Sequence, residues 1–157
     1  MRLLLVNTNT YRTPPVPPLG LEYLENAVAR SRHECRLLDL CFSDDPAADL
    51  AAALDEYRPG LAGFTVRNID TVLYQNNVFF LDDIRDLAEV VREREVGLVL
   101  GGAGYSFIPG DILEYIGADF GVDGPGEGAV VELLDRLENG GVERGTVLDG
   151  RDVTERK

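Results

Sequence analysis

Hydrophobic residues recur along the chain in five short runs separated by stretches with helical spacing. The runs have the length of buried β-strands, and they are Leu3–Val6, Cys35–Leu40, Leu61–Val66, Val96–Leu100 and Asp119–Val122. Between them, apolar residues return every three or four positions, as on one face of an amphipathic helix. The helical stripes are Leu21/Leu24/Val28, Leu50/Leu54/Tyr57, Phe80/Ile84/Leu87/Val91, Ile112/Ile116 and Val130/Leu133/Leu134/Leu137. Alternation of this kind is typical of a parallel sheet covered by helices on both faces.

The fold class that this pattern predicts is α/β, with a doubly wound, five-stranded parallel sheet of order 2-1-3-4-5, Rossmann-like or flavodoxin-like. Asp45-Pro46 is typical of a helix start, and Gly117 and Gly140 stand where helices should end. In such a sheet a ligand binds at the carboxyl ends of the first, third and fourth strands. We expect one domain over residues 1–140, with residues 141–157 as a polar tail or linker, or at most a sixth edge strand.

Charge and composition narrow the classes of partner. The chain has 157 residues and a net charge of −13, and its only lysine is the last residue. An anionic nucleic acid backbone or lipid surface would be repelled, so neither nucleic acid nor a membrane is an expected partner. No apolar run approaches the roughly 20 residues that cross a bilayer, and we expect a cytoplasmic protein.

Metal-binding residues are scarce. There are two cysteines, Cys35 and Cys41, and one histidine, His33, with no metal-ligand spacing among them. No protein-ligated metal site is predicted, and the cysteines are expected to pack as small hydrophobic residues.

Two glycine-rich segments follow predicted strands, and they are the most informative feature of the sequence. Gly101-Gly102-Ala103-Gly104 follows the fourth strand, and Gly124-Pro125-Gly126 follows the fifth. Glycine lets the backbone turn sharply and lets a flat or phosphorylated ligand touch the main chain. We therefore expect the ligand where these two strands end.

The chain lacks the residues that several known functions of this architecture need. A phospho-acceptor receiver needs acidic residues after the first strand, an aspartate after the third and a lysine after the fifth, where this chain has Asn7, Thr65 and Asp123. Neither a P-loop nor a dinucleotide-binding glycine motif follows the first strand. A flavodoxin-like FMN site remains open, with hydroxyls from Thr8, Thr10 and Thr13, as does an α/β interaction module without a ligand.

The order of four segments resembles the N-terminal cobalamin-binding domain of cobalamin-dependent radical S-adenosylmethionine enzymes. The segments are Pro14-Pro-Val-Pro-Pro-Leu-Gly-Leu-Glu-Tyr-Leu24, Val66-Arg-Asn-Ile-Asp70, Leu98-Val-Leu-Gly-Gly102 and Asp123-Gly-Pro-Gly-Glu-Gly128. The resemblance covers roughly residues 2 to 140. It implies a doubly wound sheet with the corrinoid across its carboxyl edge and the nucleotide tail threaded beside the strands.

The resemblance implies a set of cofactor-binding residues. Gly101, Gly102, Ala103 and Gly104 would form a platform for the corrin ring, and Thr65, Asn68, Gly124 and Gly126 would line the slot for the nucleotide tail. Glu127 would accept a hydrogen bond from a ribose hydroxyl or a corrin amide, or simply favour its helix N-terminus. Arg67 would bond a corrin amide or the tail phosphate, or pair with Asp70.

The lower face of cobalt is expected to lack a histidine ligand. Many cobalamin domains carry Asp-x-His-x-x-Gly after the first strand, whereas this chain has Asn9, Thr10, Tyr11 and Arg12 there, and we expect Tyr11 or Arg12 beneath the cobalt. His33 precedes the second strand and belongs at the opposite edge. Tyr74, Phe79 and Phe80 are expected to pack on helices.

The resemblance further implies a parent enzyme in which a radical S-adenosylmethionine domain, in cis or in trans, performs methyl transfer or radical ring formation. That domain holds S-adenosylmethionine and a [4Fe-4S] cluster through Cys-x-x-x-Cys-x-x-Cys. These residues do not contain that motif, so this chain alone is not expected to be catalytic.

Overall fold

A single parallel sheet organises the molecule. The computed structural model describes residues 1–12, 14–71, 73 and 75–155. The strands are β1 (Arg2–Asn7), β2 (Glu34–Asp39), β3 (Leu61–Thr65), β4 (Gly97–Gly101), β5 (Phe120–Asp123) and β6 (Thr146–Asp149). The helices are α1 (Leu19–Ala29), α2 (Pro46–Tyr57), α3 (Leu81–Arg92), α4 (Pro109–Ile116), α5 (Gly126–Glu138) and α6 (Gly150–Glu155), with a 3-10 turn, η1 (Tyr105–Phe107), after β4.

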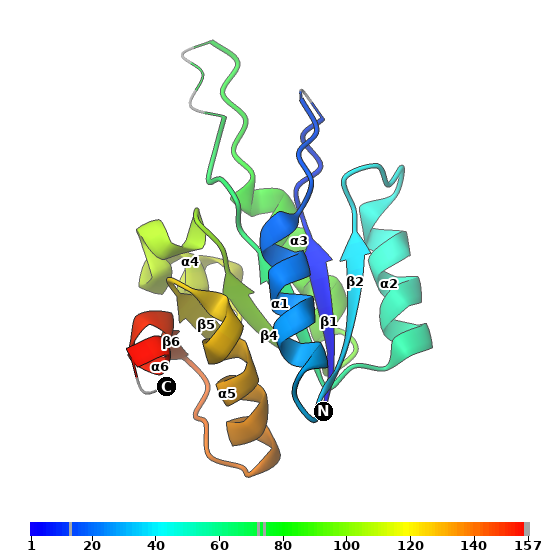
Figure 1. Cartoon of the computed structure of the whole chain (residues 1–157). Coiled ribbons are helices and arrows are strands. Elements are labelled where there is room, and N and C mark those ends of the chain that lie inside the picture. Colours follow the sequence, from blue (N-terminus) through cyan, green and yellow to red (C-terminus); the bar gives the residue numbers. More distant parts are fainter. Residues whose placement is uncertain (13, 72, 74, 156–157) are drawn as a thin grey trace.

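The strand order is β2-β1-β3-β4-β5-β6, and every neighbouring pair is parallel (Figure 1). The predicted order 2-1-3-4-5 is confirmed, and each predicted strand lies within one residue of its observed bounds. The predicted helix signals are also confirmed. Asp45 accepts a hydrogen bond from the Ala48 amide at 3.0 Å, and Gly117 ends α4 at a φ of 72°.

The C-terminal segment forms the sixth edge strand that the sequence left as the lesser alternative to a linker, because residues 146–149 form β6 and pair with β5. A four-residue strand set among glycines and charges gives little periodic signal, which is why the sequence favoured a linker. Helix α6 then packs against α5. A Cβ on Gly128 would lie 2.9 Å from Val153 Cγ1, and one on Gly150 would meet the Pro125 carbonyl.

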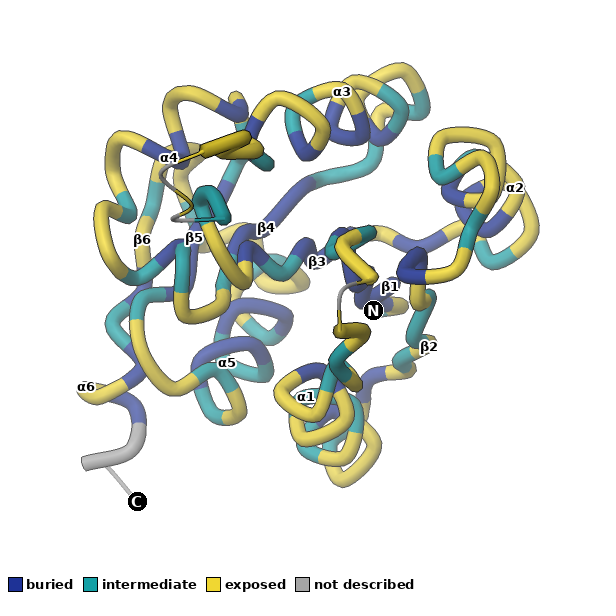
Figure 2. The backbone as a smooth tube through the Cα atoms, turned by 90° about the horizontal axis from the view of Figure 1, so that it is seen from above, coloured by how far each residue is buried: buried dark blue, intermediate teal, exposed yellow. Residues whose placement is uncertain are grey.

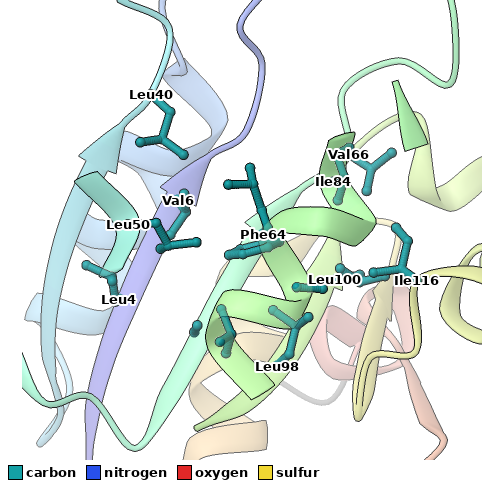
Figure 3. Packing of buried hydrophobic residues seen from close by; sticks show 14 of the residues in the cluster. Leu4, Val6, Leu40, Leu50, Phe64, Val66, Ile84, Leu98, Leu100 and Ile116 are labelled. Carbon is teal, nitrogen blue, oxygen red and sulfur yellow. The ribbon is translucent and has the colours of Figure 1, made fainter. Parts of the chain in front are cut away.

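Two hydrophobic cores cover the two faces of the sheet. Helices α2, α3 and α4 cover one face, and α1, α5 and α6 cover the other (Figure 2). On the first face, Phe64 and Leu100 of the central strands meet Leu50, Ile84 and Ile116 from the helices (Figure 3). Within the described residues, no helix is long and apolar enough to cross a bilayer.

Tyr105 is the largest fully buried side chain in the described part of the chain, and it fills the space left by a glycine. A Cβ on Gly121 of β5 would lie 1.8 Å from the Tyr105 hydroxyl oxygen. This hydroxyl has no hydrogen-bond partner among the described residues. Burial, together with the negative charge of Asp123, raises the pKa of Tyr105 to about 12.

Replacing Tyr105 with phenylalanine tests this burial. At neutral pH the substitution removes an unpaired buried hydroxyl, so we expect the free energy of unfolding to stay the same or rise by up to about 1 kcal/mol. Above pH 10 the unfolded tyrosine ionises while the folded one does not, and stability present below pH 10 is lost as the pH rises toward 12.

Urea unfolding at about pH 8 and about pH 11 should therefore show that the wild-type protein loses about 1 kcal/mol more than Tyr105→Phe. Equal losses in the two proteins would contradict the buried, unpaired state of the hydroxyl.

Candidate functional site

The carboxyl edge of the sheet is formed by three strand ends in register. Asn7 pairs with Thr65, and Thr65 pairs with Gly101, so β1, β3 and β4 end side by side. The segments that follow β1 and β3 rise beyond this edge (Figure 1). The edge is therefore where the sequence predicted the ligand crevice.

Hydrogen bonds fix the loops at this edge to one another. The Thr8 hydroxyl donates to the Thr65 carbonyl at 2.7 Å, and the Val66 amide donates to the Gly101 carbonyl at 2.7 Å. The Gly104 amide donates to the Val66 carbonyl at 2.9 Å. The ends of β1, β3 and β4 are thus preorganised rather than free to spread apart.

A slot opens between the sheet and helices α1 and α5. It encloses about 280 Å³, slightly below the range of about 300–1,000 Å³ that is typical of ligand pockets. Its lining comprises Leu5, Gly20, Leu21, Leu24, Gly63, Phe64, Thr65, Val99, Leu100, Gly101, Gly102, Val122, Gly124, Pro125, Gly126, Glu127 and Val130. Among these residues only Thr65 and Glu127 have polar side chains, so the slot is mainly apolar.

Glycines create this slot. A Cβ on Gly63, in the middle of β3, would lie 3.1 Å from Leu5 Cδ2 and 3.5 Å from Val99 Cγ1, so any side chain there would fill the floor. Gly20, the second residue of α1, has open space around its Cβ position, and a larger residue would project into unoccupied volume. Glycines at these two positions therefore keep the slot open and mainly apolar.

A second, wider hollow of about 790 Å³ adjoins the slot along the same edge. It is lined by Tyr11, Arg67, Asn68, Ile69, Asp70, Thr71, Leu73, Phe80, Ala103, Gly104 and Phe107. Because Gly102 lines the slot and Ala103 lines the hollow, the glycine-rich segment after β4 runs from one into the other. The rings of Tyr11 and Phe80 meet edge to face, with centroids 5.9 Å apart, in the wall of the hollow.

The structure brings most of the candidate residues to these two cavities. Thr65, Gly101, Gly102, Gly124, Gly126 and Glu127 line the slot, and Tyr11, Arg67, Asn68, Ala103 and Gly104 line the hollow. Asn9 and Thr10 line a narrow crevice that Arg67 and Asn68 also border. Asn68, which the sequence placed with the slot, thus lies with the hollow instead.

Arg12 lies outside both cavities. Its guanidinium donates to the Cys41 carbonyl at 2.7 Å and to the Ser43 carbonyl at 2.8 Å, and it stacks over the Phe42 ring. These contacts hold the first loop against the loop after β2. Thr13 and Tyr74, which the sequence singled out, lie outside the described residues.

Two residues had alternative interpretations. The Arg67 side chain is exposed and forms no ion pair within the described part of the chain, while Asp70 accepts from Asn77 Nδ2 at 3.3 Å. Arg67 is thus available to a ligand in the hollow. Glu127 is exposed in the first turn of α5, where the N-cap residue Pro125 provides no side-chain hydrogen bond, so both interpretations of Glu127 remain.

The single histidine is at the opposite edge, as predicted. His33 is buried directly before β2, and its Nδ1 lies 3.0 Å from the amino group of Met1. Its Nε2 lies 3.2 Å from a carboxylate oxygen of Asp135. These contacts brace the amino-terminal end of the sheet.

The β6–α6 segment supports the rim of the slot. Arg151 donates to Asp123 at 2.6 Å and to Asp149 at 2.8 Å, and the side-chain hydrogen bond from Arg151 to Asp149 lowers the pKa of Asp149. This links the end of β5, just before Gly124, to the C-terminal helix. Asp123 is accordingly part of the rim's framework.

Sequence reasoning missed Gly20 and Gly63 as residues that shape the slot. A glycine inside an apolar strand often marks a close approach by a ligand or another backbone, and Leu61-Ala-Gly-Phe-Thr65 carries that signal. Gly20 gave no comparable signal, because its role depends on where α1 lies over the sheet. Phe79 and Phe80, expected to pack on helices, directly precede α3: Phe79 lies edge to face against the Tyr115 ring of α4, and Phe80 is the N-cap residue of α3 and lines the hollow.

Comparison with known proteins identifies the family. The model of the B12 binding domain matches residues 8–134. The chain is 36% identical over 138 residues to tryptophan 2-C-methyltransferase of Streptomyces laurentii, and 31% identical over 128 residues to hopanoid C-3 methylase of Methylococcus capsulatus. These alignments cover 87% and 79% of this chain and 23% of each relative.

A solved structure agrees with this assignment. The radical S-adenosylmethionine methyltransferase TsrM from Kitasatospora setae, with cobalamin and a [4Fe-4S] cluster bound, superposes with a TM-score of 0.83 at 36% identity, over 88% of this chain and 25% of that one. The chain belongs to the B12-binding domain family, and it is a cobalamin-binding domain. The family assignment favours cobalamin over the flavin alternative.

The neighbouring glycines Gly101 and Gly102 differ sharply in the space that they leave for a side chain. Gly102 has a φ of +105°, and a Cβ there would lie 2.8 Å from both Thr65 Oγ1 and the Val66 carbonyl oxygen, whereas the nearest atom to a Cβ on Gly101 would be 3.7 Å away. We expect Gly102→Ala to lower the free energy of unfolding by about 2 kcal/mol or more, and Gly101→Ala by under about 1 kcal/mol.

Urea denaturation of the two variants measures the difference. Equal destabilisation would contradict the close contact between the segments that follow β3 and β4.

Proposed function

We propose that the chain seats the corrin ring of cobalamin over the hollow at the carboxyl edge, with the nucleotide tail in the slot between the sheet and helices α1 and α5. The observation that carries this proposal is the slot itself, an apolar cradle kept open by Gly20 and Gly63. When bound, cobalamin supplies a cobalt centre that can carry a methyl group between a donor and an acceptor.

The candidate residues then have distinct roles. Ala103 and Gly104 offer main chain and small side chains beneath a broad ring, and Gly101 and Gly102 lead from there into the slot. The Thr65 hydroxyl, at the mouth of the slot, offers a hydrogen bond to the tail. The exposed guanidinium of Arg67 suits a corrin side-chain amide or the tail phosphate.

The lower face of cobalt would meet side chains of the hollow rather than an imidazole. His33 is held at the far edge by Met1 and Asp135, and Arg12 is held by two carbonyls of another loop. Of the two residues expected beneath the cobalt, Tyr11 is therefore the one that we propose. Arg67 lines the same hollow.

The proposed parent is a cobalamin-dependent radical S-adenosylmethionine methyltransferase. The chain spans about a quarter of the length of the relatives it matches. In that parent, S-adenosylmethionine and a [4Fe-4S] cluster would be held by a further domain, in cis or in trans, above the corrin ring. We propose residues 1–140 as the part that contacts the corrinoid, with β6 and α6 packed on it as a supporting strand and helix. A cytoplasmic location stays a prediction from the sequence.

Filling the slot from Gly20 tests the proposal. Gly20 and Gly110 are both the second residue of a helix, and both have no atom within 4 Å of the Cβ position, but only Gly20 lines the slot. Phenylalanine at either position should leave the fold intact, because neither site is crowded. We expect Gly20→Phe to weaken hydroxocobalamin binding by about 10-fold or more, and Gly110→Phe by less than about 2-fold.

The measurement is a visible-absorbance titration followed by desalting, with FMN titrated in parallel. The wild-type chain should retain the corrinoid and release the flavin. Retention of FMN instead, or identical corrinoid binding by both phenylalanine variants, would contradict the proposal. A bound-state spectrum typical of histidine-ligated cobalamin would exclude the proposed lower face.

A further inference from the structure

The deep part of the slot offers a ligand no polar side chain. Its floor and walls are formed by Leu5, Leu24, Gly63, Val99 and Val130. The two polar side chains of the lining lie toward the mouth, since Thr65 is the last residue of β3 and Glu127 is an exposed residue in the first turn of α5. A group seated below them would meet hydrocarbon.

The backbone of the floor is also fully engaged. Gly63 lies in the middle of β3, where it pairs with Leu5 of β1 on one side and with Val99 of β4 on the other. In a strand flanked on both sides, the amide and carbonyl groups are used by the parallel ladder. A ligand that entered the slot would therefore find few hydrogen-bond donors or acceptors in the sheet beneath it.

A polar atom buried in such a place loses its hydrogen bonds to water and gains none in return. This matters for cobamides, which share the corrin ring but differ in the base at the end of the nucleotide tail. Dimethylbenzimidazole presents a hydrocarbon ring with two methyl groups at its outer end. Adenine, a bicyclic base of similar size, presents ring nitrogens and an exocyclic amine there.

We infer that the slot selects the lower base of its corrinoid by polarity, taking a benzimidazole cobamide in preference to a purine cobamide. The inference rests on the proposed seating of the nucleotide tail in this slot. Because the two bases have similar volumes, the selectivity comes from the unpaired purine nitrogens rather than from steric exclusion. Penalties of this kind correspond to roughly 10- to 100-fold in affinity.

The test compares three corrinoids on the intact chain: hydroxocobalamin, its adeninyl analogue, and cobinamide, which lacks the nucleotide. Dissociation constants come from visible-absorbance titration. We expect hydroxocobalamin to bind about 10-fold or more tightly than the adeninyl cobamide. Cobinamide should bind more weakly than hydroxocobalamin, because it leaves the slot empty.

A pair of valine-to-threonine variants places the selectivity in the slot. Val99→Thr introduces a hydroxyl on the slot face of β4, and Val6→Thr makes the same change at a buried valine of β1 in the core on the opposite face of the sheet. Val99→Thr should narrow the preference by about 3-fold or more, since it gives the purine a partner. Val6→Thr should leave the preference unchanged.

The possible outcomes distinguish a failure of the base selectivity from a failure of the proposed cobalamin binding. Equal affinity for the two cobamides, or equal narrowing by both threonine variants, overturns the selectivity while cobalamin binding stands. Cobinamide that binds as tightly as hydroxocobalamin overturns the seating of the tail in the slot. Failure to bind any of the three corrinoids overturns the proposed function itself, and the selectivity with it.

Discussion

Close contact between main-chain segments at the ends of β3 and β4 is the constraint on which the site depends. Gly102 approaches Val66 so closely that a Cβ would lie 2.8 Å from the Val66 carbonyl oxygen, and a Cβ on Gly104 would lie 2.9 Å from the Arg67 carbonyl. That approach lets the Gly104 amide donate a hydrogen bond to the Val66 carbonyl. This hydrogen bond joins the segment after β3 to the glycine segment after β4. A side chain at either glycine would separate these segments and open the rim.

A further glycine, in the middle of β3, lacks a side chain in the same way and produces the slot. Gly63 leaves the centre of β3 bare, so helices α1 and α5 cover the sheet without closing on it at that level. Below it the core on this face closes again around Leu3, Leu61 and Leu133. The slot is thus a cavity in an otherwise close-packed core. The strands beside it are fixed by their hydrogen-bonded ladders.

Most of the fold could be predicted from the sequence, because strand runs, helical stripes and cap residues each leave a local signal. The strand order followed from the handedness rules for parallel units, and the glycine segments pointed to the correct edge. Strand β6 could not be predicted with the same ease, since its pairing depends on β5 rather than on a pattern of its own. Arg12 and Asn68 show a further limit. Which way a loop side chain turns depends on tertiary partners, such as the Cys41 and Ser43 carbonyls, that no sequence spacing reveals.

The proposed function requires a corrinoid to lie across the glycine rim with its nucleotide tail buried beside Gly63. A crystal structure of the chain with hydroxocobalamin bound tests this most directly. We expect density for the nucleotide between α1 and α5, and cobalt above Tyr11 and Arg67 with no imidazole bonded to it. Density for the nucleotide outside the slot, or cobalt at the edge that holds His33, would contradict it.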